Sequence, residues 1–300
     1  MADRAKFLAD IASDNADVRF AAWRSAGELE ADVIGELAKL AVSDRPGVGK
    51  AAREAIHTLV HSVGKDAGAA RRGEVAKALV AVAASSAAAM PARVLALRDL
   101  SVIAAESDVA AIGKLIHDPD LREEAVFSIE RIPGSAPDKT LAAAYRESKD
   151  DFKPRLLAAL GHRRAQEGVA LAVDAMRSSN KEIAVAGARA YGRIGRKPAG
   201  AVRVPDASGL EEWLKIDVID SQLRFADEQV KQGNHTEAMR IYKTALDRPE
   251  EHWQCAAIVG IAKMGSPEAA VAIFPKLKSG NRKVRITAAN AWKQMAHAGA

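Results

Sequence analysis

Two histidines one helical turn apart form the most chemically suggestive pair in this chain. His57 and His61 stand at positions i and i+4, a spacing that places two imidazoles on one helix face and can hold zinc. The metalloprotease form of this motif needs a glutamate directly after the first histidine, and Thr58 stands there instead. Because no third ligand lies nearby, we interpret both histidines as solvent-facing and expect no metal site.

Adjacent acidic residues are the next candidates for chemistry. Neighbouring helical positions point about 100° apart, so two adjacent carboxylates do not share one site as general acid and base. They more often stabilise helix starts, where negative charge is favourable. The sequence also lacks a glycine-rich phosphate loop and a nucleophile elbow, so we predict no catalytic residue, no cofactor and no enzymatic activity. The acidic pairs are Glu123–Glu124, Glu211–Glu212 and Glu250–Glu251.

The elements that would position any site repeat along the chain. Eight stretches share one helical pattern, and five of the seven steps between them are 29 to 31 residues, while the other two are 44 and 70. A fixed period in this range indicates a solenoid, in which no single unit buries its apolar face alone. The first residues of the stretches, which define column 0, are Val18, Val48, Ala92, Leu121, Phe152, Ile183, Trp253 and Val284.

Aligned on column 0, the stretches share one buried face. Column +8 is apolar throughout, and columns +4 and +7 are mostly small, with Ala125 and Ala288 in column +4. These spacings lie on one helix face, and small residues there let a neighbouring helix approach closely. A second amphipathic segment precedes most stretches, and period-two alternation is nearly absent. We therefore predict antiparallel helix pairs and no β-sheet.

The four tryptophans divide into two groups. Trp23, Trp253 and Trp292 fall in columns that are mostly apolar, so we expect them in the core. Trp213 fits no column, and two roles stay open for it: an exposed anchor, or the residue that docks the preceding loop.

Several stretches resemble the second helix of short bacterial HEAT repeats. The resemblance is carried by the segments 18–22, 183–195 and 284–291, and it covers most of residues 15–195 and 250–300. It implies an all-α fold, a right-handed α–α superhelix of antiparallel helix pairs. Because the family pattern is a packing pattern, the resemblance informs the fold more than the function.

The repeat is interrupted once by a segment without helical period. Residues 197–209 contain two prolines and two glycines, so we interpret them as a linker or long loop. We expect a HEAT-like array over 1–196, and over 210–300 a TPR-like hairpin near 219–249 followed by HEAT-like repeats, continuous with the first array. The alternative for the hairpin is a degenerate HEAT pair with a long first helix. The residues at TPR-like offsets are Ala226, Gly233, Ala238, Tyr242, Ala245 and Pro249.

Two columns of the repeat are rich in basic residues. In HEAT arrays the second helices line the concave face, so the resemblance implies a basic inner surface there. The functional interpretation is a groove for an acidic protein segment or for phosphates, and the alternative is a solvated face with arginines near helix ends. Column +10 holds Arg131, His162, Arg193 and Lys263, and column +1 holds Arg19, Arg93, Arg122, Lys153 and Arg285.

Composition sets only broad limits. The formal net charge is +5, from 44 basic and 39 acidic side chains, which permits an acidic partner without requiring one. The single cysteine excludes an internal disulfide bond. The first residues lack the pattern of a signal peptide and no long uncharged apolar run exists, so we expect a cytoplasmic protein that does not span a membrane.

These observations favour a non-catalytic protein–protein interaction scaffold. Its concave face would bind an acidic segment of a partner protein through Arg122, Arg131, Lys153, His162, Arg193 and Lys263. The alternative is a nucleic-acid-binding HEAT-like protein with a basic groove. A HEAT-like lyase or DNA glycosylase is a third reading, for which the sequence offers only the repeat.

Overall fold

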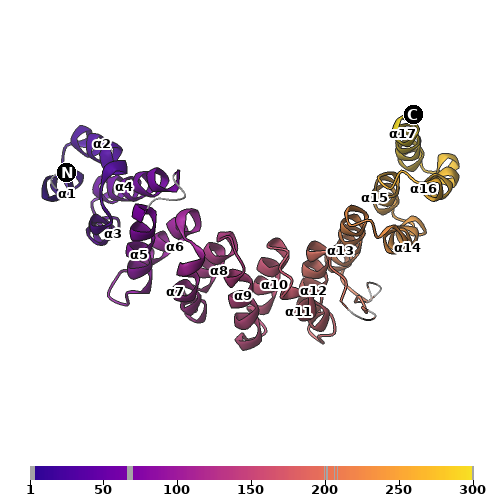
Figure 1. Cartoon of the computed structure of the whole chain (residues 1–300), viewed down its shortest axis with the longest axis horizontal. Helices are drawn as coiled ribbons and strands as arrows, with labels where there is room; N and C mark the ends of the chain where they lie inside the picture. Colours follow the sequence, from indigo (N-terminus) through magenta and orange to yellow (C-terminus); the bar gives the residue numbers. More distant parts are fainter. Residues whose placement is uncertain are drawn as a thin grey trace. The chain divides into compact units, whose positions relative to one another are not determined.

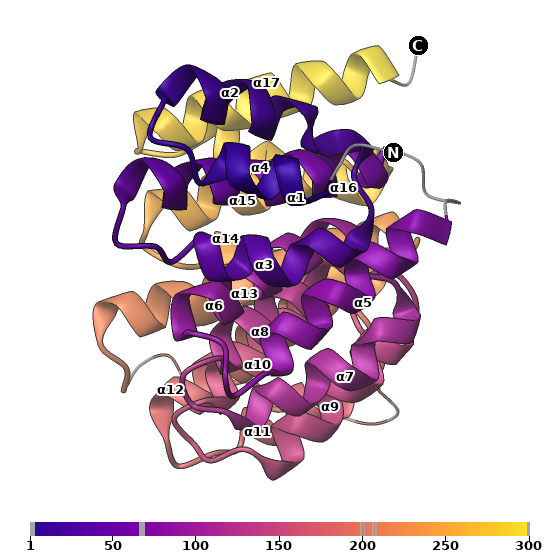
Figure 2. The same ribbon diagram turned by 90° about the vertical axis from the view of Figure 1, so that its left-hand side faces the viewer.

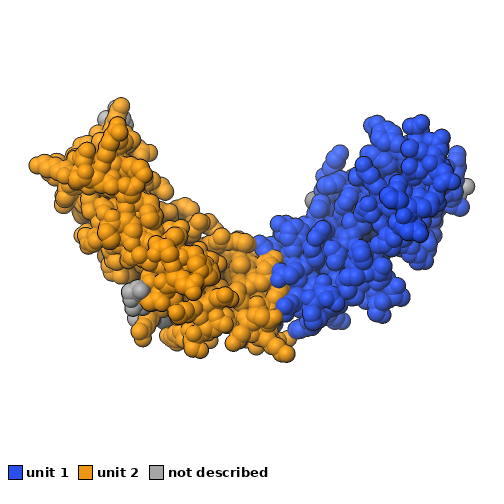
Figure 3. Space-filling view, turned by 180° about the vertical axis from the view of Figure 1, so that it is seen from behind, with its two compact units in different colours: residues 1–144 blue, residues 145–300 orange. Residues whose placement is uncertain are grey.

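All regular structure in the described residues is helical. The computed structural model describes residues 4–65, 70–198, 200, 202–205, 207 and 209–298, in which α-helices alternate with short 3-10 turns and no strand occurs. The predicted all-α class is therefore confirmed. Contacts divide the chain into two compact units, Met1–Ala144 and Tyr145–Ala300, coloured separately in Figure 3. The division falls within α9 (Ala136–Glu147).

The first unit stacks helix pairs in two layers. In chain order its elements are α1 (Arg4–Ile11), α2 (Ala16–Ser25), η1 (Ala26–Glu28), η2 (Ala31–Val33), α3 (Ile34–Leu40), α4 (Pro46–Gly64), α5 (Ala70–Ala84), α6 (Met90–Ile103), η3 (Glu106–Asp108), α7 (Val109–Gly113), η4 (Lys114–His117) and α8 (Arg122–Arg131). One layer contains α2, α4, α6 and α8, each packed on the next, and the other contains α3, α5 and α7 (Figures 1 and 2).

The second unit repeats this plan with one change. Its elements are α10 (Lys153–His162), α11 (Gly168–Ala175), α12 (Lys181–Ile194), α13 (Glu212–Lys231), α14 (His235–Leu246), α15 (Glu251–Ala262), α16 (Pro267–Ile273), η5 (Phe274–Lys278) and α17 (Arg282–Ala298). One layer runs α10, α12, α13, α15 and α17, and α11, α14 and α16 lie in the other. Since α12 and α13 are consecutive helices of the same layer, the segment 197–209 stands where the other layer would have a helix.

This segment is anchored on the helices although its described residues form none. The side chains of Val204, Ala207 and Leu210 pack against a buried cluster of Val185 on α12 with Leu214 and Val218 on α13. These contacts join the described residues of the segment to both α12 and α13.

Small residues allow the close helix contacts, as the columns predicted. Ala125 and Ala288 are 0% exposed. A Cβ atom on Gly161 would lie 3.0 Å from Cα of Ala190, and one on Gly192 would overlap the carbonyl oxygen of Ser221. The backbones of α10, α12 and α13 therefore approach one another at positions where a larger side chain does not fit.

The core prediction for the tryptophans was correct for one residue and wrong for another. Trp253 is 1% exposed, whereas Trp292 is 38% exposed and contacts the Phe274 ring, with the ring centroids 5.7 Å apart. Trp23 is half-buried. Trp292 lies on α17, which packs on α15 in its layer but on no further helix of that layer among the described residues.

Within the described part of the chain, no helix has both the length and the apolar composition needed to cross a membrane.

Candidate functional site

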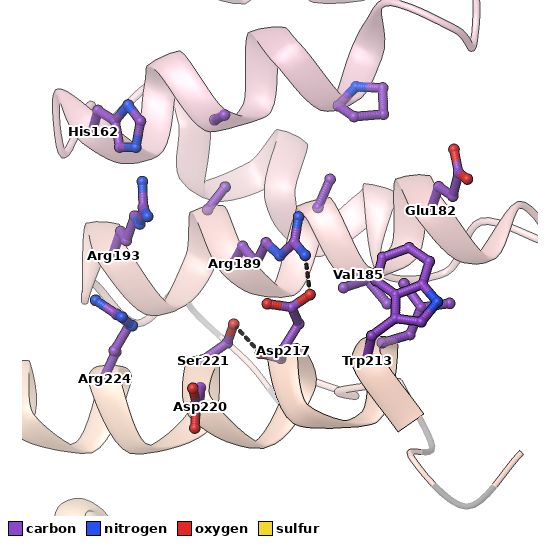
Figure 4. Close-up of a pocket in the computed structure, with 15 residues that line it drawn as sticks. His162, Glu182, Val185, Arg189, Arg193, Trp213, Asp217, Asp220, Ser221 and Arg224 are labelled. Atoms are coloured by element: carbon purple, nitrogen blue, oxygen red, sulfur yellow. Dashed lines mark hydrogen bonds and ion pairs between the residues drawn. The ribbon is translucent and has the colours of Figure 1, made fainter. Parts of the chain in front are cut away.

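A pocket of about 560 Å³ opens on the second unit between α10, α12 and α13 (Figure 4). Its volume lies within the range of roughly 300–1,000 Å³ that is typical of small-ligand sites. The three helices are consecutive members of one layer, so each contributes side chains from the same face. We call it the basic pocket, because arginines from two helices and a histidine from the third line it.

One end of the basic pocket gathers two arginines and a histidine, one from each of the three helices. His162 comes from α10, Arg193 from α12 and Arg224 from α13, and they lie one above another at the same end in Figure 4. They are spaced by 31 residues in the sequence, which is the period of the repeat. The periodicity therefore places three nitrogen-rich groups within reach of one ligand.

The middle of the pocket holds a paired arginine. Arg189 on α12 forms an ion pair with Asp217 on α13, and the Ser221 hydroxyl donates a hydrogen bond of 2.6 Å to the Asp217 carbonyl oxygen. Burial lowers the pKa of Arg189, and the neighbouring Arg193 cation lowers it further. Asp217 thus offsets a second positive charge that would otherwise add to the basic end.

The opposite end of the pocket is aromatic and acidic. Trp213 is 51% exposed there, and its indole Nε1 donates a hydrogen bond of 2.8 Å to Oε2 of Glu211. In Figure 4 its ring lies beside Val185, and Glu182 stands at this same end. Of the two roles open for Trp213, the exposed one agrees with its place in the pocket wall.

A second hollow of about 380 Å³ continues from the basic end and shares His162, Arg193 and Arg224 with the basic pocket. Its acidic residues form ion pairs with lysine and arginine side chains. Burial alone would raise the pKa of Glu228, but Lys231 and Arg164 hold it below its ordinary value. Lys263 on the edge of α15 lies 3.6 Å from Asp227. These pairs neutralise acidic residues of the hollow, and His162, Arg193 and Arg224 are the residues that it shares with the basic pocket.

Arg224 was not identified from the sequence, although a signal for it exists. Leu214 lies 31 residues after Ile183, so α13 begins a repeat unit hidden within the 70-residue step. Counted from Leu214, Arg224 stands in column +10, the column of Arg193 and His162. The unit escaped detection because Gln222 breaks the apolar column +8 and no helix precedes it in the other layer.

The other predicted binding residues lie elsewhere. Lys153 is the first residue of α10, at the opposite end from His162, and pairs with Asp150 at 3.2 Å. Arg122 and Arg131 lie in the first unit at the two ends of α8. The Arg131 guanidinium stacks over the Phe127 ring at 3.6 Å. Of the six residues, the structure brings only His162 and Arg193 into one pocket.

His57 is partly exposed, and it also has a buried partner that the sequence did not indicate. Nδ1 of His57 lies 2.7 Å from Oδ1 of Asp99, a buried carboxylate on α6, and the His57 side chain is 40% exposed. His57 and His61 both line a shallow hollow on the first unit. No group of three or more histidine, cysteine, aspartate or glutamate residues suited to a metal ion occurs in the described ranges.

Comparison with known proteins gives structural similarity only. Neither a protein family nor a curated protein matches the sequence. The structure is similar to the crystal structure of an engineered protein, with a TM-score of 0.44 and 17% identity over 99% of this chain and 89% of that chain. It is also similar to human deoxyhypusine hydroxylase in complex with glycerol, with a TM-score of 0.40 and 14% identity over 75% of this chain and 97% of that chain.

The prediction of a non-catalytic scaffold was wrong. The second of these similar structures is an enzyme by its name, and this finding contradicts the step from a helical stack to an absence of catalysis. The similarity assigns no reaction to this chain.

Proposed function

We propose that the second unit binds a small phosphate-bearing molecule in the basic pocket. The observation that carries the proposal is the convergence of His162, Arg193 and Arg224 from three helices at one end of a pocket of about 560 Å³. Guanidinium groups bind phosphate oxygens through paired hydrogen bonds, and an imidazole adds a further donor when protonated.

The distribution of charge within the pocket supports an anionic group at this end in particular. The lining includes three arginines and three acids, so the pocket as a whole is nearly neutral. Two of the acids do not oppose an anion at the basic end, since Glu182 lies at the Trp213 end and Asp217 is paired with Arg189, whereas Asp220 lies near Arg224. A ligand with a phosphate at the basic end and a planar or apolar part against Trp213 and Val185 would match both ends.

Calorimetric titration of the full chain with inorganic pyrophosphate tests the proposal. We expect saturable binding that weakens as sodium chloride is raised, because counterions screen the exposed arginines. Arg224→Glu should abolish it, since the change replaces a cation by an anion at the centre of the cluster. Arg224 is exposed and forms no ion pair with any other described residue, so this variant should keep the wild-type melting temperature.

Arg122→Glu is the matched control. It makes the same change of charge at the first residue of α8 in the first unit, outside the basic pocket. It should therefore leave pyrophosphate binding unchanged. Equal loss in both variants would mean that binding follows net charge, and the basic pocket would then not be the site.

We further propose that the helix pairs are HEAT-like repeats. The 31-residue spacing of His162, Arg193 and Arg224 and the buried alanine columns support this. An acidic partner protein and nucleic acid remain predictions for the same cations. Displacement of pyrophosphate by polyglutamate would support the acidic partner protein, and displacement by duplex DNA would support nucleic acid. Binding of DNA should weaken more steeply with salt than binding of polyglutamate.

A further inference from the structure

A second pocket of the second unit lies where the layer lacks a helix. It has a volume of about 750 Å³ and is bounded by α12, α13, α14 and described residues of the segment 197–204. The described residues of the segment that line it are Lys197, Gly200, Val202 and Val204. We call this space the linker pocket.

The wall of the linker pocket is aromatic and aliphatic. The rings of Tyr191 on α12 and Phe225 on α13 stack with centroids 4.6 Å apart and an interplanar angle of 14°. Val204 of the segment and Ile241 of α14 also line the pocket. Such a surface favours an apolar body, because removing it from water is the main driving force for binding.

Cations at the rim of the pocket outnumber acids. Lys197 and Arg240 both pair with Glu237, at 3.5 Å and 2.8 Å. All three residues line the pocket. One carboxylate therefore pairs with two cations, so these three side chains have a net charge of +1 that can attract an anion.

Tyr191 brings a hydroxyl group into this apolar environment. The residue is 7% exposed, and no hydrogen bond joins its hydroxyl to any residue that the structure describes. Burial raises the pKa of Tyr191 to about 12, and the nearby Glu237 carboxylate raises it while Arg240 lowers it. The hydroxyl is thus a neutral donor close to the charged rim, where it can donate a hydrogen bond to a ligand in the pocket.

We infer that the linker pocket binds a monocarboxylic acid with an apolar chain. The chain packs on the Tyr191–Phe225 wall, and the carboxylate lies at the rim, where Arg240 and Lys197 neutralise it. The Tyr191 hydroxyl donates to the same carboxylate. Ser221 lines both pockets, but none of the residues invoked for this ligand lines the basic pocket, and the inference does not depend on the function proposed there.

Calorimetry with decanoate, decanol and decylamine tests the inference, because the three probes share one chain length and differ in charge. We expect decanoate to bind at least tenfold more tightly than decanol, and decylamine more weakly still. Arg240→Ala should reduce the decanoate affinity by about tenfold, the effect of losing one charge-assisted contact, and should leave decanol unchanged. Tyr191→Phe should weaken decanoate binding and leave decanol unchanged.

Arg224→Ala is the matched control, because it removes an arginine of the basic pocket and should leave decanoate binding unchanged. Hydrogen exchange supplies an independent measurement, in which decanoate should protect the amides of Val202 and Val204. The inference is overturned if decanol binds as tightly as decanoate, if none of the probes binds, or if folded Arg240→Ala keeps the wild-type affinity.

Discussion

Nδ1 of His57 lies 2.7 Å from Oδ1 of Asp99, and this contact joins α4 to α6 in the first unit. Asp99 is 3% exposed, and its second oxygen, Oδ2, has no hydrogen-bond partner. A buried carboxylate with one satisfied oxygen depends strongly on the group that satisfies it. The hydrogen bond from His57 therefore offsets part of the free-energy cost of burying the Asp99 carboxylate.

This contact makes the stability of the first unit depend on pH. The hydrogen bond with Asp99 raises the pKa of His57 above 6.5, against the lowering effect of burial; Glu54 adds to the rise and Arg53 opposes it. Since the folded value exceeds the unfolded one, the stabilisation is fully present below about pH 6.5 and is lost as the pH rises through the folded value. Asp99→Asn should lower the pKa of His57, as an NMR titration would show.

The melting temperature gives a second measure of the same coupling. The difference between wild type and Asp99→Asn should be larger near pH 5.5 than near pH 8. His61→Gln serves as the control on the same helix and should leave the pH dependence as in wild type. A pH-independent difference for Asp99→Asn would show that the His57 charge does not contribute.

A glycine at the α12–α13 contact should tolerate no side chain. A Cβ atom on Gly192 would overlap the carbonyl oxygen of Ser221, so Gly192→Ala must separate two helices of the layer. We expect a loss of about 1–3 kcal/mol in unfolding free energy, as for other overpacked cores. Urea denaturation followed by circular dichroism would measure it.

Gly73→Ala is the control for this substitution. Gly73 lies in α5 with no atom within 4 Å of the added Cβ, so alanine should stabilise by about 0.5–1 kcal/mol through helix propensity. If both variants gain stability, α12 and α13 do not pack as closely as the structure indicates.

The first turn of α12 depends on its capping residue. The Asn180 side chain accepts hydrogen bonds from the backbone N–H groups of Glu182 at 2.9 Å and Ile183 at 3.3 Å. Asn180→Ala should lower the unfolding free energy by about 1 kcal/mol, whereas Asn180→Asp should retain it, because aspartate caps equally well. Equal melting temperatures for wild type and Asn180→Ala would contradict the capping role.

The sequence predicted the packing better than the binding sites. Burial of Ala125 and Ala288 follows from helical periodicity, since each column faces a neighbouring helix of its layer. Trp292 obeys the same periodicity but is 38% exposed, because α17 has a described layer neighbour on one side only. Periodicity indicates which face packs, and the number of neighbours decides whether the face is covered.

Part of the candidate site was also predictable from the periodicity of the repeat. His162 and Arg193 share a column, so their proximity follows from the repeat. Arg224 shares it too, but Gln222 obscured its unit. The pairing of His57 with Asp99 spans 42 residues and joins different columns of two helices. Such a contact depends on the rotation of each helix about its axis, which a column pattern does not specify.

From the ion pair between Arg189 and Asp217 we predict a gain in pyrophosphate affinity, the opposite of the loss expected for Arg224→Glu. Asp217 neutralises Arg189 in the middle of the basic pocket, so Asp217→Asn should release a positive charge toward a bound anion. Because both side chains are partly exposed, we expect only about 0.5–1 kcal/mol, or roughly a two- to fivefold gain in pyrophosphate affinity. Asp247→Asn removes an equal charge at the end of α14, outside the lining of the basic pocket, and should change the affinity less. If Asp217→Asn weakened binding instead, Asp217 would act by holding Arg189 in place, and the arrangement of the arginines would matter more than their charge.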